Sequence, residues 1–431
     1  MLLRRNANSK CLLLLGVFCA TASATTRTVG QPNTPCPNAQ YQTITDAINA
    51  ANPGDTIQIC PALYPEQLVI TKPLTLLGIG VQGVGRVLLQ PPSLVPVGLL
   101  PFEAVISVVN TTGVTIQNLS IDASNNTVAT CTVGLAGIHY YNSSGTVDSN
   151  VILGARLTDP QTCSTLFPGN GFGVQVDKDA NLNSPFQVTI RRNSIHNFTR
   201  NGVLVVGAGE TADIDGNSIS GVGPSTGGNQ FGVFIANGAV GHVTGNMMDE
   251  GACGALSRTD CINLRSEGVV LRSAGDGTVI DGNTITNAQS GVFLNGANNA
   301  VITNNVIRNI DGQSGIHVQF LTNSLIAGNR IFNVGPINAA TSQNEEGCGI
   351  NEVSGTSNLG NTIRDNAVSD AYCGVAYVTA DLLESGLYSN TLYSTLNSDN
   401  YPIAYPPALE PAQASASSTQ SSTREFQPQR K

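Results

Sequence analysis

The sequence predicts an all-β solenoid, a stack of coils in which one short strand follows another with no helix between them. Three observations lead to this fold class: an asparagine that recurs in a fixed apolar frame, a glycine that opens a further apolar segment, and a composition with 46 glycines, no tryptophan and only 11% charged residues. Low charge and abundant glycine are typical of turn-rich β architectures. The frame around Asn283 begins again 22 residues later, at Asn305. Repeats of this length indicate stacked coils.

The asparagine frame defines two strands of each repeat. Three residues before each asparagine and two residues after it the side chain is apolar, so one strand precedes the asparagine and one follows it. Stacked asparagines suit a tight bend, because Asn tolerates the left-handed backbone conformation and its amide can hydrogen-bond to the Asn one coil above. The nine predicted ladder residues are Asn150, Asn193, Asn217, Asn246, Asn283, Asn305, Asn329, Asn366 and Asn390.

A glycine opens the third strand of each repeat. Because side chains alternate along a strand, we expect the residue after the glycine to face inward and the next one to face outward. The connections between the post-asparagine strand and the glycine strand vary most in length, so insertions are predicted to gather on one side of the solenoid. The glycines are Gly137, Gly173, Gly202, Gly232, Gly268, Gly291, Gly315, Gly349 and Gly374.

These repeats resemble the right-handed parallel β-helix proteins, a group that includes pectate lyases and polygalacturonases. The resemblance covers about residues 41–396. The segment YQTITDAINAANPGDTIQICPALYPEQLVITKPLTLLGIG looks like the start of pectin-esterase-type β-helices, with an amphipathic cap helix that carries Ile44, Ala47, Ile48 and Ala51. The resemblance therefore implies a right-handed parallel β-helix of about ten or more coils, with a short N-terminal cap helix.

Four segments follow from this reading of the chain. Residues 1–24 have the basic start, the apolar run and the small residues before a cleavage point that are typical of a signal peptide. Residues 25–40 form an N-terminal extension, and residues 41–400 form the β-helix. Residues 401–431 lack apolar periodicity and are predicted to be disordered. We therefore expect a secreted protein, either extracellular or periplasmic.

Charge limits the partners. The formal net charge is −9, and removal of Arg4, Arg5 and Lys10 with the leader makes it −12. An acidic surface argues against nucleic acid and anionic membranes. No stretch after the leader reaches the roughly 18 apolar residues that a membrane span needs. We expect a monomer that binds neither nucleic acid nor membrane.

Eight cysteines remain after the leader, and an even number in an exported chain favours disulfides. Cys348 and Cys373 each directly precede a strand-opening glycine in consecutive coils, so stacking brings them within bonding distance. We predict pairing in chain order: Cys36 with Cys60, Cys131 with Cys163, Cys253 with Cys261, and Cys348 with Cys373.

The outward residues of the glycine strands face the variable loops and form the candidate ligand surface. Two interpretations of their aromatic residues stand side by side: a strip on which sugars stack, or side chains covered by their own loops. The candidate substrate-binding residues are Gln175, Phe234, Arg272, Phe293, Asn295, His317 and Gln319. The expected ligand is a polysaccharide, neutral or weakly charged because of the acidic surface.

One metal site is a candidate. The stretch DKDANLN places Asp177, Asp179 and Asn181 at alternate positions, with Asn183 next in the series. Oxygen ligands at this spacing can wrap Ca²⁺. A solvated turn is the alternative interpretation, because the stretch lacks the glycine and the terminal glutamate of an EF-hand loop. No other cofactor is predicted.

The sequence leaves catalysis open. Asp177 and Arg272 are predicted to lie three coils apart, roughly 14 Å, which is too far for one reaction centre. TDCINLRS and ALYPE are similar to polygalacturonase and pectin-esterase motifs, but Thr259 and Ala62 depart from those patterns. We expect the acidic loop residues to be solvated; they are Glu250, Asp260, Glu345 and Glu346.

Two functions therefore stay open. The first is an exported protein that binds polysaccharide along one sheet face, with cleavage of a lyase or glycoside hydrolase type as a further possibility. The alternative is a non-catalytic structural or adhesive protein, secreted or at the cell surface.

Overall fold

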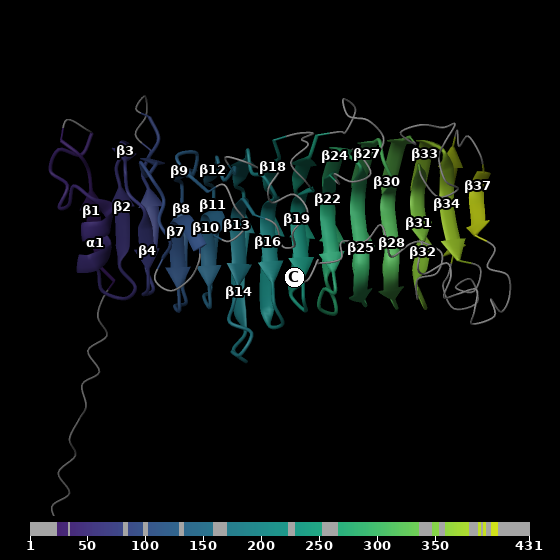
Figure 1. Ribbon diagram of the computed structural model, residues 1–431, viewed down its shortest axis with the longest axis horizontal. Coiled ribbons are helices and arrows are strands. Elements are labelled where there is room, and N and C mark those ends of the chain that lie inside the picture. The colour runs from purple at the N-terminus through teal and green to yellow at the C-terminus, as the bar shows by residue number, and fades with distance from the viewer. Residues whose placement is uncertain are drawn as a thin grey trace, which may run out of the picture.

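A computed structural model shows three parallel sheets that wrap around a common long axis (Figure 1). The structure describes residues 24–32, 35–80, 85–97, 102–128, 133–157, 170–222, 229–251, 266–335, 347–352, 358–378, 387–388, 391–393 and 398–403. The chain passes from sheet A to sheet B to sheet C and then enters the next coil. Every strand pairs in parallel with its counterparts in the coils before and after it, as the repeats predicted.

Sheet A contains the strands before the asparagines. It has 13 strands in chain order. They are β1 (Thr26–Val29), β2 (Thr56–Ile59), β5 (Thr75–Gly78), β8 (Val114–Gln117), β11 (Gly145–Asp148), β14 (Phe186–Arg191), β17 (Glu210–Asp215), β20 (Val240–Thr244), β23 (Val279–Asp281), β26 (Val301–Thr303), β29 (Leu325–Ala327), β32 (Thr362–Arg364) and β35 (Leu387–Tyr388).

Sheet B contains the strands after the asparagines. It has 12 strands. They are β3 (Leu63–Tyr64), β6 (Leu88–Leu89), β9 (Ser120–Asp122), β12 (Val151–Leu153), β15 (Ser194–His196), β18 (Ser218–Ser220), β21 (Met247–Asp249), β24 (Thr284–Ala288), β27 (Val306–Ile310), β30 (Arg330–Val334), β33 (Ala367–Ala371) and β36 (Thr391–Tyr393).

Sheet C contains the glycine strands and carries the candidate ligand surface. It also has 12 strands. They are β4 (Leu68–Ile70), β7 (Phe102–Val109), β10 (Gly134–Tyr141), β13 (Phe172–Asp177), β16 (Asn201–Val206), β19 (Gln230–Ala236), β22 (Ser266–Arg272), β25 (Ser290–Asn298), β28 (Ser314–Thr322), β31 (Cys348–Glu352), β34 (Cys373–Val378) and β37 (Ser398–Ile403). The longest connections, such as those from β12 to β13 and from β21 to β22, lead into this sheet from sheet B.

The predicted cap helix, α1 (Ile44–Ala50), lies at the N-terminal end of the stack (Figure 1). Its Ile44, Ala47 and Ile48 are buried, and the Thr43 hydroxyl accepts a hydrogen bond from the backbone N–H of Asp46 and so caps the helix. The segment assigned to an N-terminal extension contributes a strand, because β1 pairs with β2.

The interior follows the predicted alternation. The residue after each strand-opening glycine lies in the main apolar core; those residues include Val174, Val203, Val233, Val269, Val292 and Ile316. The glycines are required by close packing. A Cβ at Gly173 would lie 2.3 Å from Cγ2 of Ile195 and 2.5 Å from the carbonyl oxygen of Gly202. The coil has no space for a side chain at this position.

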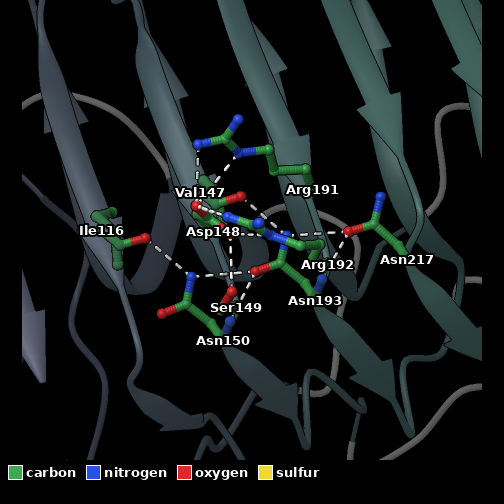
Figure 2. Close-up of polar contacts among 9 residues, drawn as sticks. All are labelled: Ile116, Val147, Asp148, Ser149, Asn150, Arg191, Arg192, Asn193 and Asn217. Carbon is green, nitrogen blue, oxygen red and sulfur yellow. Dashed lines mark hydrogen bonds and ion pairs between the residues drawn. The ribbon is translucent and has the colours of Figure 1, made fainter.

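The asparagine ladder is present at eight of the nine predicted positions, and Asn390 lies outside the described residues. In Figure 2, Asn150 donates from its backbone N–H and from Nδ2 to Oδ1 of Asn193, over 2.9 and 3.1 Å, and Asn193 bonds Asn217 in the same way. Nδ2 of Asn193 also donates to the carbonyl of Val147 in the preceding coil. Every polar atom of such a side chain is therefore bonded.

One part of the ladder prediction is wrong. The residue with the left-handed backbone is the one before the ladder asparagine, for example Ser149 with φ 59° and Arg192 with φ 55°. The ladder asparagines are absent from the residues with positive φ. The preceding residue makes the turn, and the ladder asparagine is then free to direct its amide along the stack.

Two of the four predicted disulfides are confirmed. Cys36 bonds Cys60 with a Cα–Cα distance of 6.2 Å, and Cys348 bonds Cys373 with a Cα–Cα distance of 4.4 Å. The other four cysteines (Cys131, Cys163, Cys253 and Cys261) lie outside the described residues. The predicted signal peptide and most of the predicted tail lie outside them as well. Within the described parts, no helix has the length and apolar character needed to span a bilayer.

Candidate functional site

The outer face of sheet C carries a second apolar cluster, separate from the main core. It contains the outward residues Leu204, Phe234, Val270 and Phe293, together with Phe172 and Phe231. Phe231 and Phe234 meet edge to face with their ring centroids 5.4 Å apart. Phe234 is 1% exposed and Phe293 is 6% exposed. These two rings point outward as predicted, but neither offers a free face to a sugar in this arrangement.

A second column of outward side chains on sheet C, next to this cluster, reaches solvent. We call five of its side chains the polar row, and the parallel register places them in one line: Tyr141, Asp177, Arg272, Asn295 and Gln319. Four of them are half-buried, and Gln319 is 9% exposed. Val206 and Ala236 continue the line between Asp177 and Arg272. The three steps predicted between Asp177 and Arg272 are therefore present.

At the N-terminal end of the row, polar side chains bond one another. Nε2 of His139 lies 2.6 Å from Oδ1 of Asp177, and Nε2 of Gln175 donates to Oδ2 of the same carboxylate over 2.8 Å. The ring of Phe102 lies on His139 with centroids 4.0 Å apart. Burial raises the pKa of Tyr141, and the charges of Asp179 and Asp177 raise it further. The phenol therefore stays protonated and can donate a hydrogen bond.

At the C-terminal end, the predicted contact residues come together. The rings of Phe293 and His317 have centroids 5.0 Å apart. Nδ2 of Asn295 donates to Oε1 of Gln319 over 3.3 Å, and Nε2 of Gln319 lies 3.2 Å from Nε2 of His317. The parallel register aligns Arg272 with Asn295 in the neighbouring coil. These side chains form one connected group of donors and acceptors.

A buried arginine that was not predicted from the sequence lies beside the cluster. Arg200 donates from a guanidinium nitrogen to the carbonyl of Asn229 over 2.7 Å, and its Cζ lies 4.9 Å from the ring centroid of Phe231. Burial lowers its pKa to about 10, while the charge of Glu267 favours the cation. The repeat could have revealed this arginine. Arg200 stands two residues before a strand-opening glycine, and Gln230 and Gln289 occupy the same position in other coils, so a long polar side chain recurs there.

The candidate calcium ligands form a turn that is held by its own hydrogen bonds. Oδ1 of Asp179 accepts from the backbone N–H and from Nδ2 of Asn181, both over 2.9 Å. Asp177 is directed instead toward His139. Among the described residues, no three His, Cys, Asp or Glu side chains gather as a metal site. The calcium site stays a prediction.

The expectation for Glu250 is wrong. Its side chain is 0% exposed, and burial raises its pKa well above 4.5. In the next coil the left-handed residue at this corner is Asn287, whereas here it is Gly251, with φ 75°. The shift of the turn by one residue directs Glu250 inward, where Oε1 would lie 2.7 Å from a Cβ at Gly232. Asp260, Glu345 and Glu346 lie outside the described residues.

Comparison with known proteins identifies the fold. Residues 250–395 match the model of the right-handed β-helix region. The chain is a right-handed parallel β-helix. Among solved structures, this β-helix is similar to the Dettilon tailspike protein, with a TM-score of 0.50 and 14% identity over 79% of this chain and 62% of the tailspike chain. The β-helix thus spans less than two thirds of the tailspike's length.

Two further solved structures are similar to this chain with lower TM-scores. A lacto-N-biosidase from Eubacterium ramulus has a TM-score of 0.47 and 12% identity over 88% of this chain and 68% of its own. An alginate lyase has a TM-score of 0.48 and 13% identity over 82% of this chain and 73% of its own. No curated protein sequence matches the β-helix significantly.

Proposed function

We propose that the protein binds a neutral or weakly charged polysaccharide along the polar row on the outer face of sheet C. The observation that carries this proposal is the line of hydrogen-bonding side chains, most of them half-buried, which occupies two coils at one end and three coils at the other, with Val206 and Ala236 between them. Neighbouring coils are roughly 4.8 Å apart. A straight row with a short repeat suits a polymer better than a compact ligand.

The chemistry of the row matches sugar hydroxyls. Arg272 and the protonated Tyr141 donate, Asp177 accepts, and the amides of Asn295 and Gln319 do both. A hydroxyl group needs both kinds of partner. The formal charge of −9 disfavours a polyanionic chain, because the long-range field of the protein repels it.

Binding without cleavage is the simpler reading of the row. Paired carboxylates for acid and base catalysis require two acids near the scissile bond. Asp177 is the only carboxylate of the row, and three steps of the sheet separate it from Arg272. An assay for new reducing ends and unsaturated products tests whether the bound polymer is also cut.

A structural or adhesive role is the second candidate, and the burial of the outward aromatic column favours it. Phe234 and Phe293 stabilise the outer face as a second core would. Under this alternative the long, disulfide-bonded solenoid is itself the functional part. We also propose export of the mature chain, which is consistent with the disulfides Cys36–Cys60 and Cys348–Cys373.

The decisive experiment measures retention of the chain from residue 25 onward on a panel of immobilised neutral polysaccharides. Replacement of Asn295 and Gln319 together by alanine should weaken binding about tenfold, because two amide contacts are lost. The matched control replaces Gln187 of sheet A and Arg308 of sheet B, two exposed side chains on other faces. Retention equal to wild type in the Asn295 and Gln319 variant contradicts the proposed site. No retention of any polysaccharide by the wild type favours the structural role.

A further inference from the structure

The corner between sheets C and A has a left-handed residue directly after the polar-row position in seven coils, and in the coil of β13 this position is Lys178, which is not among the residues with positive φ. In six coils this residue is an asparagine, a serine or a glycine, which tolerate the conformation. In the coil of β28 it is a phenylalanine. The series is Asn110, Asn142, Gly207, Asn237, Ser273, Gly296 and Phe320, with φ between 48° and 116°.

Phe320 is an outlier in this series. Its φ is 52°, and it is the one aromatic residue with positive φ within the described parts of the chain. A bulky side chain is strained in this region of backbone space. The strain is not offset by burial, since the side chain is 42% exposed, in contrast to Phe234 and Phe293. Asparagine at this corner would fold with less strain, and strain that persists is found most often at functional sites.

The location of Phe320 connects it to the polar row. It directly follows Gln319, the last member of the row, whose side chain bonds Asn295. In the preceding coil the equivalent corner residue is Gly296, which has no side chain. Phe320 is thus the residue next in the chain to the last member of the row, and its ring is exposed to solvent.

We propose that Phe320 is the aromatic platform on which one pyranose residue of the bound polysaccharide stacks. This inference rests on the proposed function and assigns it the stacking residue that Phe234 and Phe293 cannot supply while buried. The ring offers an apolar face to sugar C–H groups, while Gln319 and Asn295 bond the hydroxyls at the ring edge. The recognised unit is thus an uncharged pyranose with one face of C–H groups.

The test compares polysaccharide affinity and thermal midpoint for Phe320→Asn, Phe320→Tyr and wild type. Phe320→Asn should bind about tenfold more weakly, because the stacking area is lost. Its thermal midpoint should rise by about 2 °C, because the strain is relieved. Phe320→Tyr should keep the affinity. The matched control is Met247→Ala, which removes an exposed apolar side chain from the outer face of sheet B.

The two readouts separate the possible results. Weaker binding with a higher midpoint supports the platform, because a merely structural phenylalanine would lower the midpoint when it is removed. Unchanged affinity in Phe320→Asn, with loss of affinity in the Asn295 and Gln319 variant, overturns the platform and leaves the proposed function standing. Unchanged affinity in both variants overturns both. A wild-type chain that retains no polysaccharide also overturns both.

Discussion

Buried polar groups differ in their hydrogen bonding between the asparagine ladder and the outer face of sheet C. In the ladder, Oδ1 of Asn305 accepts two hydrogen bonds from Asn283, and its Nδ2 donates to Asn329 and to the carbonyl of Ile280. On the face, Asn201 is 0% exposed, and neither atom of its amide has a hydrogen-bond partner among the described residues. The same residue type is fully bonded at one place and unbonded at the other.

The contrast extends beyond Asn201. Within the parts of the chain that the structure describes, the hydroxyls of Ser107 and Ser314 and Oε1 of Gln175 are also buried on sheet C without a partner. An unsatisfied buried polar group costs about 1–3 kcal/mol. A region under selection for stability alone would replace such groups by apolar ones. Such groups are expected where a surface serves a purpose other than stability, which is consistent with the proposed ligand surface on sheet C.

The backbone shows the same division. Beside the ladder, the left-handed corner residues are short or flexible side chains such as Ser149 and Arg192, and Arg192 also bonds Asp148 over 2.6 Å (Figure 2). Beside the polar row, the corner includes the strained and exposed Phe320. The one aromatic residue with positive φ among the described residues therefore lies next to the proposed ligand surface.

The largest effect is expected in the ladder. Asn305→Leu removes four hydrogen bonds and leaves the backbone N–H of Asn283 buried and unbonded, so the free energy of unfolding should fall by about 3 kcal/mol or more. Chemical denaturation monitored by circular dichroism measures it. The matched control is Asn52→Leu, at an exposed position outside the ladder. Equal midpoints for the Asn305 variant and wild type would contradict the structural role of the ladder.

The sequence predicted the ladder well because its signal is periodic. The frame around Asn150 or Asn305 repeats in each coil from β11 onward, and the strand register of those coils follows from it with no knowledge of loops. The burial of side chains on the outer face of sheet C could not be predicted in this way. Alternation along a strand shows that Phe234 points outward, but only the packing of Phe231 and the neighbouring segments decides whether an outward ring is covered.

The burial of Glu250 and the left-handed conformation of Phe320 could not be predicted from the sequence, because each depends on a single departure from the repeat. Glu250 was expected in water, and a shift of the left-handed turn to Gly251 turned it inward. Phe320 occupies a corner whose conformation becomes visible only when the coils are aligned in three dimensions. Periodic reasoning is least sensitive to such single departures from the repeat.

Two carboxyl groups, those of Glu210 and Glu250, are buried inside the coils and should make the stability of the protein depend on pH. Burial raises the pKa of Glu210 to about 8, and burial raises that of Glu250 well above 4.5. Between pH 4.5 and 8 the unfolded chain releases these protons while the folded chain keeps them, so stability falls as the pH rises. We expect the free energy of unfolding to fall across this window by about 1.4 kcal/mol per pH unit for each carboxyl that keeps its proton.

Thermal midpoints of wild type, Glu210→Gln and Glu250→Gln between pH 4.5 and 8 test this expectation. Each glutamine variant should flatten the dependence on pH, because an amide does not titrate. The exposed Asp276→Asn serves as control and should leave the dependence unchanged. A wild-type midpoint that rises from pH 4.5 to 8 would show that the interior carboxyls are not the dominant groups.

The smallest effect on stability is expected from the addition of calcium. This experiment tests whether the polar row binds a cation at its N-terminal end. A Ca²⁺ ion at Asp177, Asp179 and Asn181 has to compete with the contact between Asp177 and His139, at 2.6 Å, and with the turn held by Asp179. We therefore propose weak binding, with a dissociation constant on the order of 1 mM. Calcium at 5 mM should then raise the thermal midpoint by about 1 °C, because binding to the folded state alone stabilises it.

EDTA should reverse the increase, and Asp179→Asn should abolish it. An increase that persists in Asp179→Asn would place the ion elsewhere. No increase in wild type would leave the segment as a hydrogen-bonded turn and restrict the polar row to direct contacts with its ligand.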